Sequence, residues 1–385
     1  SHNEDYFSES YSLRKFHNYI KSKLIIGIGS SFKKKIHLLD LSSGRGGDIL
    51  KYMDNDTNLK FMLGLDISSD ISESCERYYF TNSPKPLAVF LRADTSKNIM
   101  NTQCSIIDDV DDQKNKKHTE TMLSILYNNS NPIPKKYKKI QTKYKNLAKD
   151  GFDIISSQFS MHYYFQSQES FQGFIQNLND NIKLNGYFIG TCYNGQKIFE
   201  DLKSNPIFEY TDKTGNLLFK LEKKYDSNDF IYHKQDIENM FGNEIDVYMD
   251  SIGQTITEYL VNFDFFKDVM KENGFEIIIP DTISPKYSNI FRQDYFEDGL
   301  GQFENVIDKL PEIKQYDKLF QRKYEGAYDL YIHDSLKKLS SFNNYFIFQK
   351  VKLKGSEEPE ESEKVGWGMS PSDIQKIENE NIEEW

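Results

Sequence analysis

Cysteine is scarce in this sequence of 385 residues, and long apolar runs are missing. The three cysteines, Cys75, Cys104 and Cys192, are scattered, with no CxxC pair and no even framework. This pattern argues against a disulfide scaffold and a structural zinc site, so we expect no metal and a reducing, intracellular compartment. No run approaches the length of a membrane span and no signal peptide is present, so we expect no membrane partner.

The net charge of −11 at first argues against a polyanionic partner, but the charge is unevenly distributed. Residues 355–385 carry nine Glu and Asp373 against two Lys, which accounts for −8 of the total. This tail has the composition of a disordered segment, whereas residues 133–149 are rich in lysine. Local basic surface decides nucleic-acid binding, so that class of partner stays open. The lysine-rich stretch is either a solvated segment, which we favour, or a surface that follows RNA.

What the sequence does contain is a strand, a small-residue turn and a helix over residues 36–52, IHLLDLSSGRGGDILKY. Apolar residues lead into Gly44, Gly46 and Gly47, which let the backbone approach a ligand closely. The N-terminus of the following helix can face an anion or a sugar. Such turns bind nucleotide-like ligands outside the carboxyl ends of parallel strands, although they also serve simple packing.

Strands and helices alternate through the first half of the chain, which predicts a parallel sheet in an α/β fold. Polar residues 96–150 interrupt this rhythm as an insertion, and 195–340 reads as irregular, with antiparallel strands and further insertions. We therefore predict one domain over 1–354, followed by the acidic tail 355–385. The other expected elements are helices at 11–28, 70–80, 168–182 and 264–273 and strands at 59–65, 87–92, 152–156, 187–192, 256–263 and 345–353, with Asn185-Gly186 as a turn before 187.

Three carboxylates end three successive strands: Asp40, Asp66 and Asp94. An acidic residue at the end of the second strand can accept hydrogen bonds from both hydroxyls of a ribose. Asp94 with Thr95 stands where an adenine amino group could be read. A single strand-end Asp would be explained by capping the next helix. Three of them in register with a glycine turn predict a ligand that contains adenosine.

Seven segments of the chain, within about 16–265 and in a fixed order, carry a more specific signal. They are LRKFHNYIKSKLI (13–25), LLDLSSGRGGDILKY (38–52), GLDIS (64–68), RADTS (92–96), FDIISSQFSMHYYF (152–165), LNGYFIGT (184–191) and ITEYLVNF (256–263). In this combination the sequence resembles the mRNA cap guanine-N7 methyltransferases, which use S-adenosylmethionine. Its Lys-, Asn- and Ile-rich composition and its long insertion are similar to versions from large DNA viruses, where this activity is one domain of a capping enzyme.

The resemblance implies an α/β class I (Rossmann-like) methyltransferase with a mixed seven-stranded sheet, helices on both faces and insertions. It implies transfer of the methyl group of S-adenosyl-L-methionine to N7 of the 5′ guanosine cap by in-line displacement, giving m7GpppN and S-adenosylhomocysteine. N7 has a lone pair and no proton, so we expect no catalytic acid or base, only proximity and orientation. The implied partners are 5′-capped mRNA and other capping-enzyme domains or subunits, in a host cytoplasm or a virion.

The resemblance also assigns residues to the cofactor. Lys21 would bind the methionine carboxylate, Asp66 the ribose hydroxyls, and Asp94 with Thr95 the adenine edge, while Gln158 would close the pocket. Lys21 by itself would be read as a surface lysine that covers apolar neighbours. The complete implied set is Lys21, Asp40, Ser42, Gly44, Asp48, Asp66, Asp94, Thr95 and Gln158.

For the cap, Glu258 would accept hydrogen bonds from guanine N1–H and N2–H₂, which selects G over A. Tyr163 would stack on the base, His162 would bond to the base or the ribose, and Arg45 would contact the phosphates or the ribose. Without the resemblance, a core tyrosine, a buried imidazole and a solvent-facing glutamate would be equally good explanations. The complete implied set is Asn18, Arg45, His162, Tyr163, Glu258 and Tyr345.

Two departures from the family pattern concern the site. Ser42 stands where the family has the first glycine of Gly-Cys-Gly. It adds a Cβ and a hydroxyl near the methionine of the cofactor, so the site either tolerates the larger residue or binds the cofactor less tightly. The family's cap tyrosine falls near Asn343 here, so we expect Tyr345, two residues on, in the cap pocket. Two alternative functions remain at this point: a methyltransferase for another substrate, and a non-catalytic capping subunit with the same fold.

Overall fold

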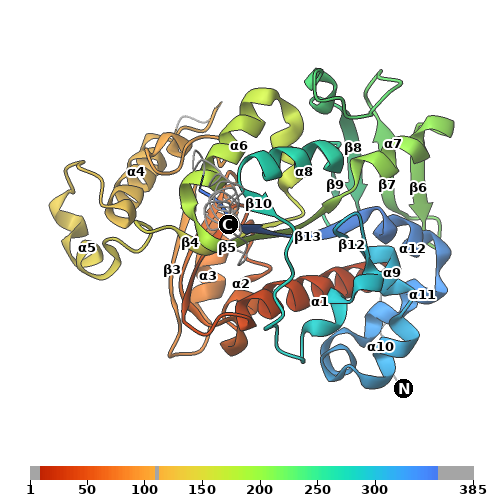
Figure 1. Cartoon of the computed structure of the whole chain (residues 1–385), viewed down its shortest axis with the longest axis horizontal. Coiled ribbons are helices and arrows are strands. Elements are labelled where there is room, and N and C mark those ends of the chain that lie inside the picture. The colour runs from red at the N-terminus through yellow and green to blue at the C-terminus, as the bar shows by residue number, and fades with distance from the viewer. Residues whose placement is uncertain (1–8, 109–111, 354–385) are drawn as a thin grey trace, which may run out of the picture.

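The computed structural model describes residues 9–108 and 112–353. Its centre is a nine-stranded sheet in the order β11-β12-β13-β5-β4-β1-β2-β3, with β10 paired to β13 (Figure 1). The strands from β1 to β5 are mutually parallel, and β13 runs antiparallel to β5. Their bounds are β1 Ile36–Asp40, β2 Leu59–Asp66, β3 Leu87–Arg92, β4 Phe152–Gln158, β5 Ile182–Tyr193, β10 Phe275–Glu276, β11 Phe296–Glu297, β12 Leu300–Gln302 and β13 Asn343–Lys350.

This sheet confirms the expected α/β architecture and corrects its size. Nine strands form instead of seven, because the outer edge of β13 pairs with β12 near Tyr345 and with β10 near Lys350. The expected turn at Asn185-Gly186 is also wrong. Asn185 has φ = 65° inside β5, where the register with β4 shifts, so the pair makes an irregularity within a strand that begins at Ile182.

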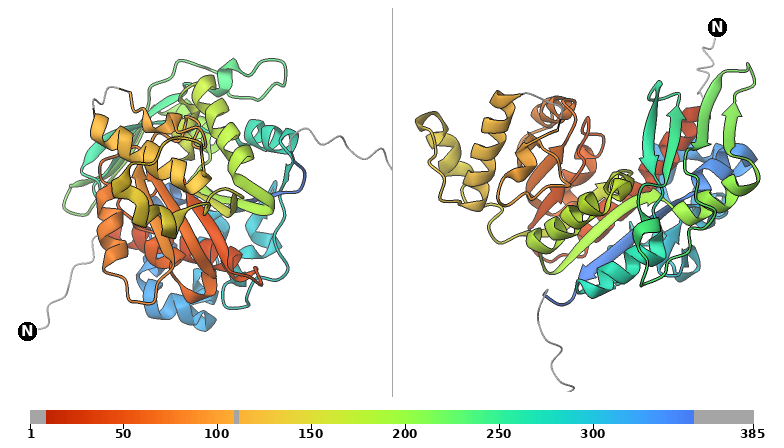
Figure 2. Two further views of the ribbon diagram at one scale, coloured as in Figure 1. Left: turned by 90° about the vertical axis from the view of Figure 1, so that its left-hand side faces the viewer. Right: turned by 90° about the horizontal axis from the view of Figure 1, so that it is seen from above.

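Helices cover both faces of the sheet (Figures 1 and 2). One face carries α1, α2 and α3, and the other carries α4, α6 and α8. The helix expected at the end of 36–52 is a single turn, α2, whereas those expected at 11–28, 70–80, 168–182 and 264–273 form within two residues of their predicted ends. The bounds are α1 Glu9–Ser30, α2 Ile49–Tyr52, α3 Ile71–Tyr79, α4 Gln113–Tyr127, α6 Gln168–Asn181 and α8 Phe263–Glu272.

Helix α1 is the element that the C-terminal part of the chain holds in place. Its apolar face is fully buried, and a buried ion pair joins Lys23 Nζ to Asp317 Oδ2 at 2.6 Å. Tyr19 donates a hydrogen bond to the same carboxylate at 2.8 Å. A charge pair this deep is costly to break, because the partner left behind would be buried without compensation. The helix therefore has one fixed rotation, which sets the direction of its other side chains.

The insertion at 96–150 is more structured than its polar composition suggests. It contains α4 and a shorter helix, α5 Lys138–Tyr144. The second half of α4 buries Met122, Leu123 and Ile125 in the main core. The insertion therefore packs as an extension of the domain, and the lysines of its lysine-rich part stay on the surface. Figure 2 shows this region projecting from one end of the molecule.

The region 195–340 forms a second, four-stranded antiparallel sheet and six α-helices, as the irregular pattern indicated. The strand expected at 256–263 ends at Tyr259, because α8 begins at Phe263 with Asn262 as its N-cap. This sheet has the order β6-β7-β8-β9. The remaining bounds are β6 Ile207–Thr211, β7 Leu217–Lys223, β8 Glu244–Met249, β9 Gln254–Tyr259, α7 Gly195–Ser204, α9 Phe303–Ile307, α10 Leu310–Tyr316, α11 Asp329–Ile332 and α12 Asp334–Ser341.

Other sequence expectations have simpler outcomes. All three cysteines are free. Among the described helices, none combines the length and the apolar character that crossing a membrane requires. Residues 9–108 and 112–353 contain no group of three or more His, Cys, Asp or Glu side chains placed to hold a metal ion. The acidic tail 355–385 lies outside the described residues.

Candidate active site

The turn after β1 needs its glycines for two different reasons. Gly44 has φ = 51°, and a Cβ there would meet nothing closer than Asp66 Oδ2 at 3.9 Å. Gly46 has φ = 76°, and a Cβ there would lie 2.6 Å from Ile49 Cδ1 and 3.0 Å from Ser74 Cα. The first glycine keeps the turn open toward a ligand, and the second lets the turn pack on α3.

Asp66 fixes this turn from the end of β2. Its Oδ2 accepts a hydrogen bond from Gly44 N at 2.8 Å, and its Oδ1 accepts one from Ser68 N at 2.8 Å. Burial raises the pKa of Asp66 above its usual value, against the lowering effect of these two N–H donors. The carboxylate therefore stands directly beside the open glycine, where a ribose could replace or share these contacts.

Asp40, at the end of β1, is buried beneath the turn. Its Oδ1 accepts a hydrogen bond from Ser42 N at 3.1 Å. Burial raises the pKa of Asp40 to about 7, with the nearby charges of Asp48 and Asp66 adding to the shift. Asp40 thus supports the backbone of the turn from inside rather than facing an open site.

Asp94 and Thr95 follow β3 and also have partners in the protein. Asp94 Oδ1 accepts hydrogen bonds from Ser96 N at 3.0 Å and Ser96 Oγ at 2.6 Å. The hydroxyl of Thr95 is buried between Leu41 O at 3.2 Å and the hydroxyl of Tyr164 at 2.6 Å. Both residues hold the loop after β3 against the turn after β1, which leaves Asp94 Oδ2, 3.5 Å from Lys97 Nζ, as the more available oxygen.

Lys21 of α1 meets the same turn through a small charged network. Its Nζ lies 2.8 Å from Asp48 Oδ1, and Lys51 Nζ lies 2.8 Å from the same oxygen. Lys51 also donates to Asn18 Oδ1 at 2.9 Å. Burial would raise the pKa of Asp48, but the two lysines lower it well below its ordinary value, so the carboxylate is ionised. Two cations thus share one anion at the N-terminal end of α2, which leaves positive charge for a further carboxylate.

Ser42 is accommodated by a partner on the neighbouring strand. Its hydroxyl is hydrogen-bonded to the hydroxyl of Ser160, which also lies 2.8 Å from Ser157 Oγ. The side chain therefore points toward the end of β4 and the loop that follows it. Gln158, the last residue of β4, donates to Ser156 Oγ at 3.0 Å and accepts from Thr191 Oγ1 at 3.0 Å, so it is buried within the sheet end.

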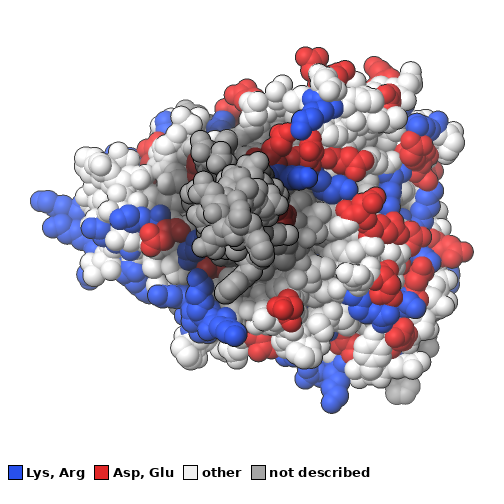
Figure 3. All heavy atoms as spheres, viewed as in Figure 1, with Lys and Arg blue, Asp and Glu red and all other residues white. Residues whose placement is uncertain are grey.

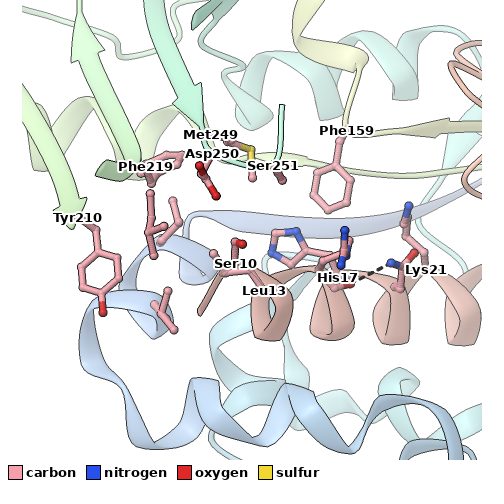
Figure 4. A pocket seen from close by; sticks show the side chains of 15 residues that line it. Ser10, Leu13, His17, Lys21, Phe159, Tyr210, Phe219, Met249, Asp250 and Ser251 are labelled. Carbon is pink, nitrogen blue, oxygen red and sulfur yellow. Dashed lines mark hydrogen bonds between the residues drawn. The ribbon is translucent and has the colours of Figure 1, made fainter. Parts of the chain in front are cut away.

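A cavity of about 180 Å³ lies between α1, the second sheet and α12, and we call it the α1 cavity (Figure 4). Lys21 and Phe159 line one end of it, and Tyr210 lines the other. The cavity is also lined by Asn18 of α1. Its remaining lining residues are Ser10, Leu13, Arg14, His17, Leu218, Phe219, Met249, Asp250, Ser251, Leu336 and Leu339.

Phe159 is a residue that the sequence interpretation passed over. It has φ = 53°, an unusual backbone for a bulky residue, and its N–H donates to both Thr191 O at 2.9 Å and Thr191 Oγ1 at 3.1 Å. Its ring stacks on His17 with centroids 5.0 Å apart. Strained residues of this kind concentrate at functional sites. The available signal was its position between Gln158 and Ser160, inside a segment that already carried the resemblance.

His162, Tyr163 and Glu258 come together from two distant segments. His162 Nε2 lies 3.5 Å from Glu258 Oε1, and the ring of Tyr163 lies 4.2 Å from that of His162. His162 and Glu258 are buried, while Tyr163 is 42% exposed. Neither nitrogen of His162 nor Glu258 Oε2 has a hydrogen-bond partner within the described residues.

The electrostatics of this cluster follow from burial. Burial raises the pKa of Glu258 to about 8 and lowers that of His162 to about 3. At neutral pH the pair is therefore a neutral imidazole beside a mostly protonated carboxyl group. Buried polar atoms without partners are rare and costly. These atoms are therefore candidates for hydrogen bonds to a ligand.

Two predicted cap residues do not join this cluster. Tyr345 is fully buried, its hydroxyl donates to Ile290 O, and its ring packs against Phe303. The prediction that Tyr345 lines the cap pocket is therefore wrong, because its side chain is a core element. Arg45 is 66% exposed on its side chain and pairs with Asp70 at 3.0 Å, so it lies at the rim of the turn beside α3.

The model of one protein family matches residues 2–339, and it describes the mRNA (guanine-N(7))-methyltransferase domain. The chain belongs to this family. Its members use S-adenosylmethionine. The predicted family, cofactor and enzyme class are thus confirmed.

Individual relatives agree with the family. The chain is 28% identical over 372 residues to a "Probable mRNA-capping enzyme" of Acanthamoeba polyphaga mimivirus, covering 91% of this chain and 28% of the relative. It is 22% identical to the mRNA cap guanine-N(7) methyltransferase of Eremothecium gossypii over 90% of this chain and 66% of that protein. The chain spans less than two thirds of the length of these relatives. The mimivirus relative agrees with the expected link to large DNA viruses.

Solved structures resemble the chain only distantly. An S-adenosylmethionine-dependent methyltransferase from Clostridium acetobutylicum is 13% identical, with a TM-score of 0.36, over 68% of this chain and 80% of that chain. One from Mesorhizobium loti is 9% identical, also with a TM-score of 0.36, over 86% and 96%. The fold assignment rests on the strand order of the sheet described above.

Proposed function

We propose that this chain transfers the methyl group of S-adenosylmethionine to N7 of the 5′ guanosine cap of mRNA, giving m7GpppN and S-adenosylhomocysteine. The observation that carries the proposal is the buried His162–Glu258 pair, in which both ring nitrogens and Glu258 Oε2 lack hydrogen-bond partners among the described residues. His162 follows β4 of the sheet that carries the cofactor turn, and Glu258 comes from β9 of the second sheet. The family match over residues 2–339 supports treating 1–354 as one methyltransferase domain.

The cofactor side fits a bound S-adenosylmethionine. Gly44 leaves space above the turn, and Asp66 places a carboxylate beside that space for the two ribose hydroxyls. Lys21 and Lys51 share one anion, Asp48, so Lys21 retains attraction for the methionine carboxylate. When bound, the cofactor supplies a methyl group on a positively charged sulfur, a good leaving arrangement.

The acceptor side fits guanine in particular. Glu258, once ionised, accepts hydrogen bonds from N1–H and N2–H₂, a donor pair that adenine lacks on this edge. A site that buries such an acceptor rejects the wrong base strongly, because the carboxylate would otherwise remain unpartnered. Tyr163, half-exposed beside His162, and Phe159, at the cavity end near Lys21, offer aromatic faces for a ring that gains positive charge.

Proton transfer is not part of this reaction. N7 carries a lone pair in the plane of the base and no proton, so the nucleophile needs no general base. Rate acceleration then comes from holding N7, the methyl carbon and the sulfur in line, and from electron-rich surroundings for the product cation. His162 stays neutral, which removes one positive charge that would oppose the developing cation.

Incubation of the full chain with labelled S-adenosylmethionine and GpppA-capped RNA, followed by cap digestion, tests the proposal. We expect label in N7-methylguanosine. Label on another atom, or cofactor binding without binding of capped RNA, would indicate a methyltransferase for another substrate. Intact binding of both ligands without methyl transfer would indicate a non-catalytic capping subunit. Either result overturns the proposed function. The further capping-enzyme domains expected as partners need the same test with longer versions of the protein.

A further inference from the structure

A basic and aromatic surface lies beyond β3, outside the site described above. It combines the lysine-rich stretch 135–149 with the C-terminal end of α3 and the loop that follows it, and we call it the β3-edge surface. Figure 3 shows Lys and Arg gathered at the end of the molecule that holds α5, while the opposite end mixes both signs of charge. From 113 to 149 the sequence has ten lysines and one acidic residue, Glu120.

The lysines of this surface are free to meet a ligand. Among residues 9–108 and 112–353 no ion pair is formed by any of the lysines of stretch 135–149, and all of them are exposed. Elsewhere the described lysines commonly have a carboxylate partner, as Lys183 has Asp153 at 2.9 Å. Unpaired lysines in one cluster are the electrostatic signature of a polyanion site. They are Lys135, Lys136, Lys138, Lys139, Lys143, Lys145 and Lys149.

Two exposed aromatic rings stand at the end of α3. Tyr79 is 74% exposed and Phe80 is 80% exposed, and their ring centroids are 5.3 Å apart. Lys85 Nζ lies 5.7 Å from the Tyr79 ring, and Arg77 is exposed one turn earlier. Large exposed aromatic rings lower the solubility of a protein. Beside cations they can bind nucleic-acid bases, because every base has a face that can stack on a ring.

The two parts of the surface meet at the edge of the sheet. Tyr78 packs on Phe90 of β3 with centroids 5.9 Å apart, and both Tyr78 and Tyr144 of α5 pack against the same core. Burial, and after it the nearby Tyr144, raise the pKa of Tyr78. Tyr144 of α5 thus lies near Tyr78 of α3, which brings the lysines of α5 and the rings of Tyr79 and Phe80 to the same edge of the sheet.

Helix α3 leads from the active site to this surface. Arg45 of the cofactor turn contacts Asp70 and Glu73 at the start of α3. Phe80 follows Glu73 by seven residues, which is about 10 Å of helix. A few nucleotides would cover that distance. We propose that the β3-edge surface binds the single-stranded RNA that follows the cap, an inference that rests on the proposed function of the site.

The experiment compares two substrates with the full chain: the dinucleotide cap GpppG, and GpppG-capped RNAs extended by about 4 to 16 nucleotides. One variant replaces Lys138, Lys139, Lys143 and Lys145 by Ser, and a second carries Tyr79→Ser and Phe80→Ser. The matched control removes the same charge from four exposed lysines elsewhere on the molecule that form no ion pair among the described residues: Lys213, Lys271, Lys318 and Lys323.

We expect KM for the extended RNAs to rise about tenfold in the lysine variant, with kcat unchanged and with GpppG methylated as before. The salt dependence of RNA binding should become shallower by up to about 0.7 per lysine removed, as loss of phosphate contacts requires. The aromatic variant should raise KM for extended RNAs without changing the salt dependence. The control variant should behave as the wild-type chain.

Equal KM values for extended RNA in the lysine variant and the control would overturn the proposal and would favour a protein as the partner of the β3-edge surface. The proposal fails equally if wild-type KM does not fall as RNA is added to the cap. Methylation of GpppG by the wild-type chain reports separately on the proposed function. The inference about RNA can therefore fail while the cap reaction stands.

Discussion

Changing the charge of Glu258 is the most direct test of how this site selects guanine. With a pKa of about 8, the carboxyl group is about one-tenth ionised at pH 7 and about nine-tenths ionised at pH 9. Guanine offers only donors on its N1 and N2 edge, so the ionised form is the one that binds. We therefore expect kcat/KM for the cap to rise about tenfold from about pH 7 to its plateau near pH 9, with a slope of about one on logarithmic axes below the pKa.

The Glu258→Gln variant should show neither the tenfold rise of kcat/KM with pH nor the high plateau near pH 9. A hydrogen bond to a charged group contributes about 1.5–3 kcal/mol, so kcat/KM at about pH 9 should fall about ten- to hundredfold, while at about pH 7 the loss is smaller. The assay is initial-rate methylation of GpppA at saturating cofactor, which limits the contribution of Asp40, the other nearby group that titrates near pH 7. Glu244→Gln on the adjacent strand β8 is the matched control. A flat wild-type profile, or a variant profile parallel to it, would refute this account of recognition.

Three further outcomes follow from the site. Asp66→Ala should abolish S-adenosylmethionine binding in calorimetry, whereas Glu258→Ala should bind it normally and lose methyl transfer; equal losses in both variants would contradict the two-sided site. Because the pKa of Asp40 is raised to about 7 in the folded state, this group by itself should lower the free energy of unfolding by roughly 1.4 kcal/mol per pH unit between about pH 4 and pH 7, so the difference in unfolding free energy between the wild-type chain and Asp40→Asn should change with that slope in denaturant titrations at several pH values. Tyr345→Phe should lower the melting temperature slightly and leave KM for the cap unchanged, because the Tyr345 hydroxyl donates its hydrogen bond to Ile290 O. A raised KM would instead support the predicted role of Tyr345 in cap binding.

The sequence identified the parallel half of the fold well because each of its strands is a short apolar run that ends in a polar residue. The same rule located Asp66 and the glycine turn, since strand ends and turns are local features. The 3.6-residue pattern of α1 gave its extent within two residues and placed Asn18 and Lys21 on one helix. These features depend on few distant contacts, which is why they can be read from the chain alone.

Other features depend on partners that no local pattern specifies. The burial of Tyr345 results from packing against Phe303, which directly follows β12 and lies 42 residues earlier in the chain. The backbone of Phe159 is held at positive φ by Thr191 on the next strand. The burial of the second half of α4 depends on the core beneath the insertion, so composition alone indicated only a polar insertion there.

The hydroxyl contact between Ser42 and Ser160 joins the two ligand sites. Ser42 belongs to the cofactor turn, and Ser160 begins the loop that carries His162 and Tyr163. A glycine at position 42 could not form this link. We therefore expect Ser42, the residue that departs from the family pattern, to couple the proposed cofactor and cap sites. By thermodynamic reciprocity each ligand should then change the affinity for the other by the same factor, and Ser42→Gly should reduce that factor in binding measurements.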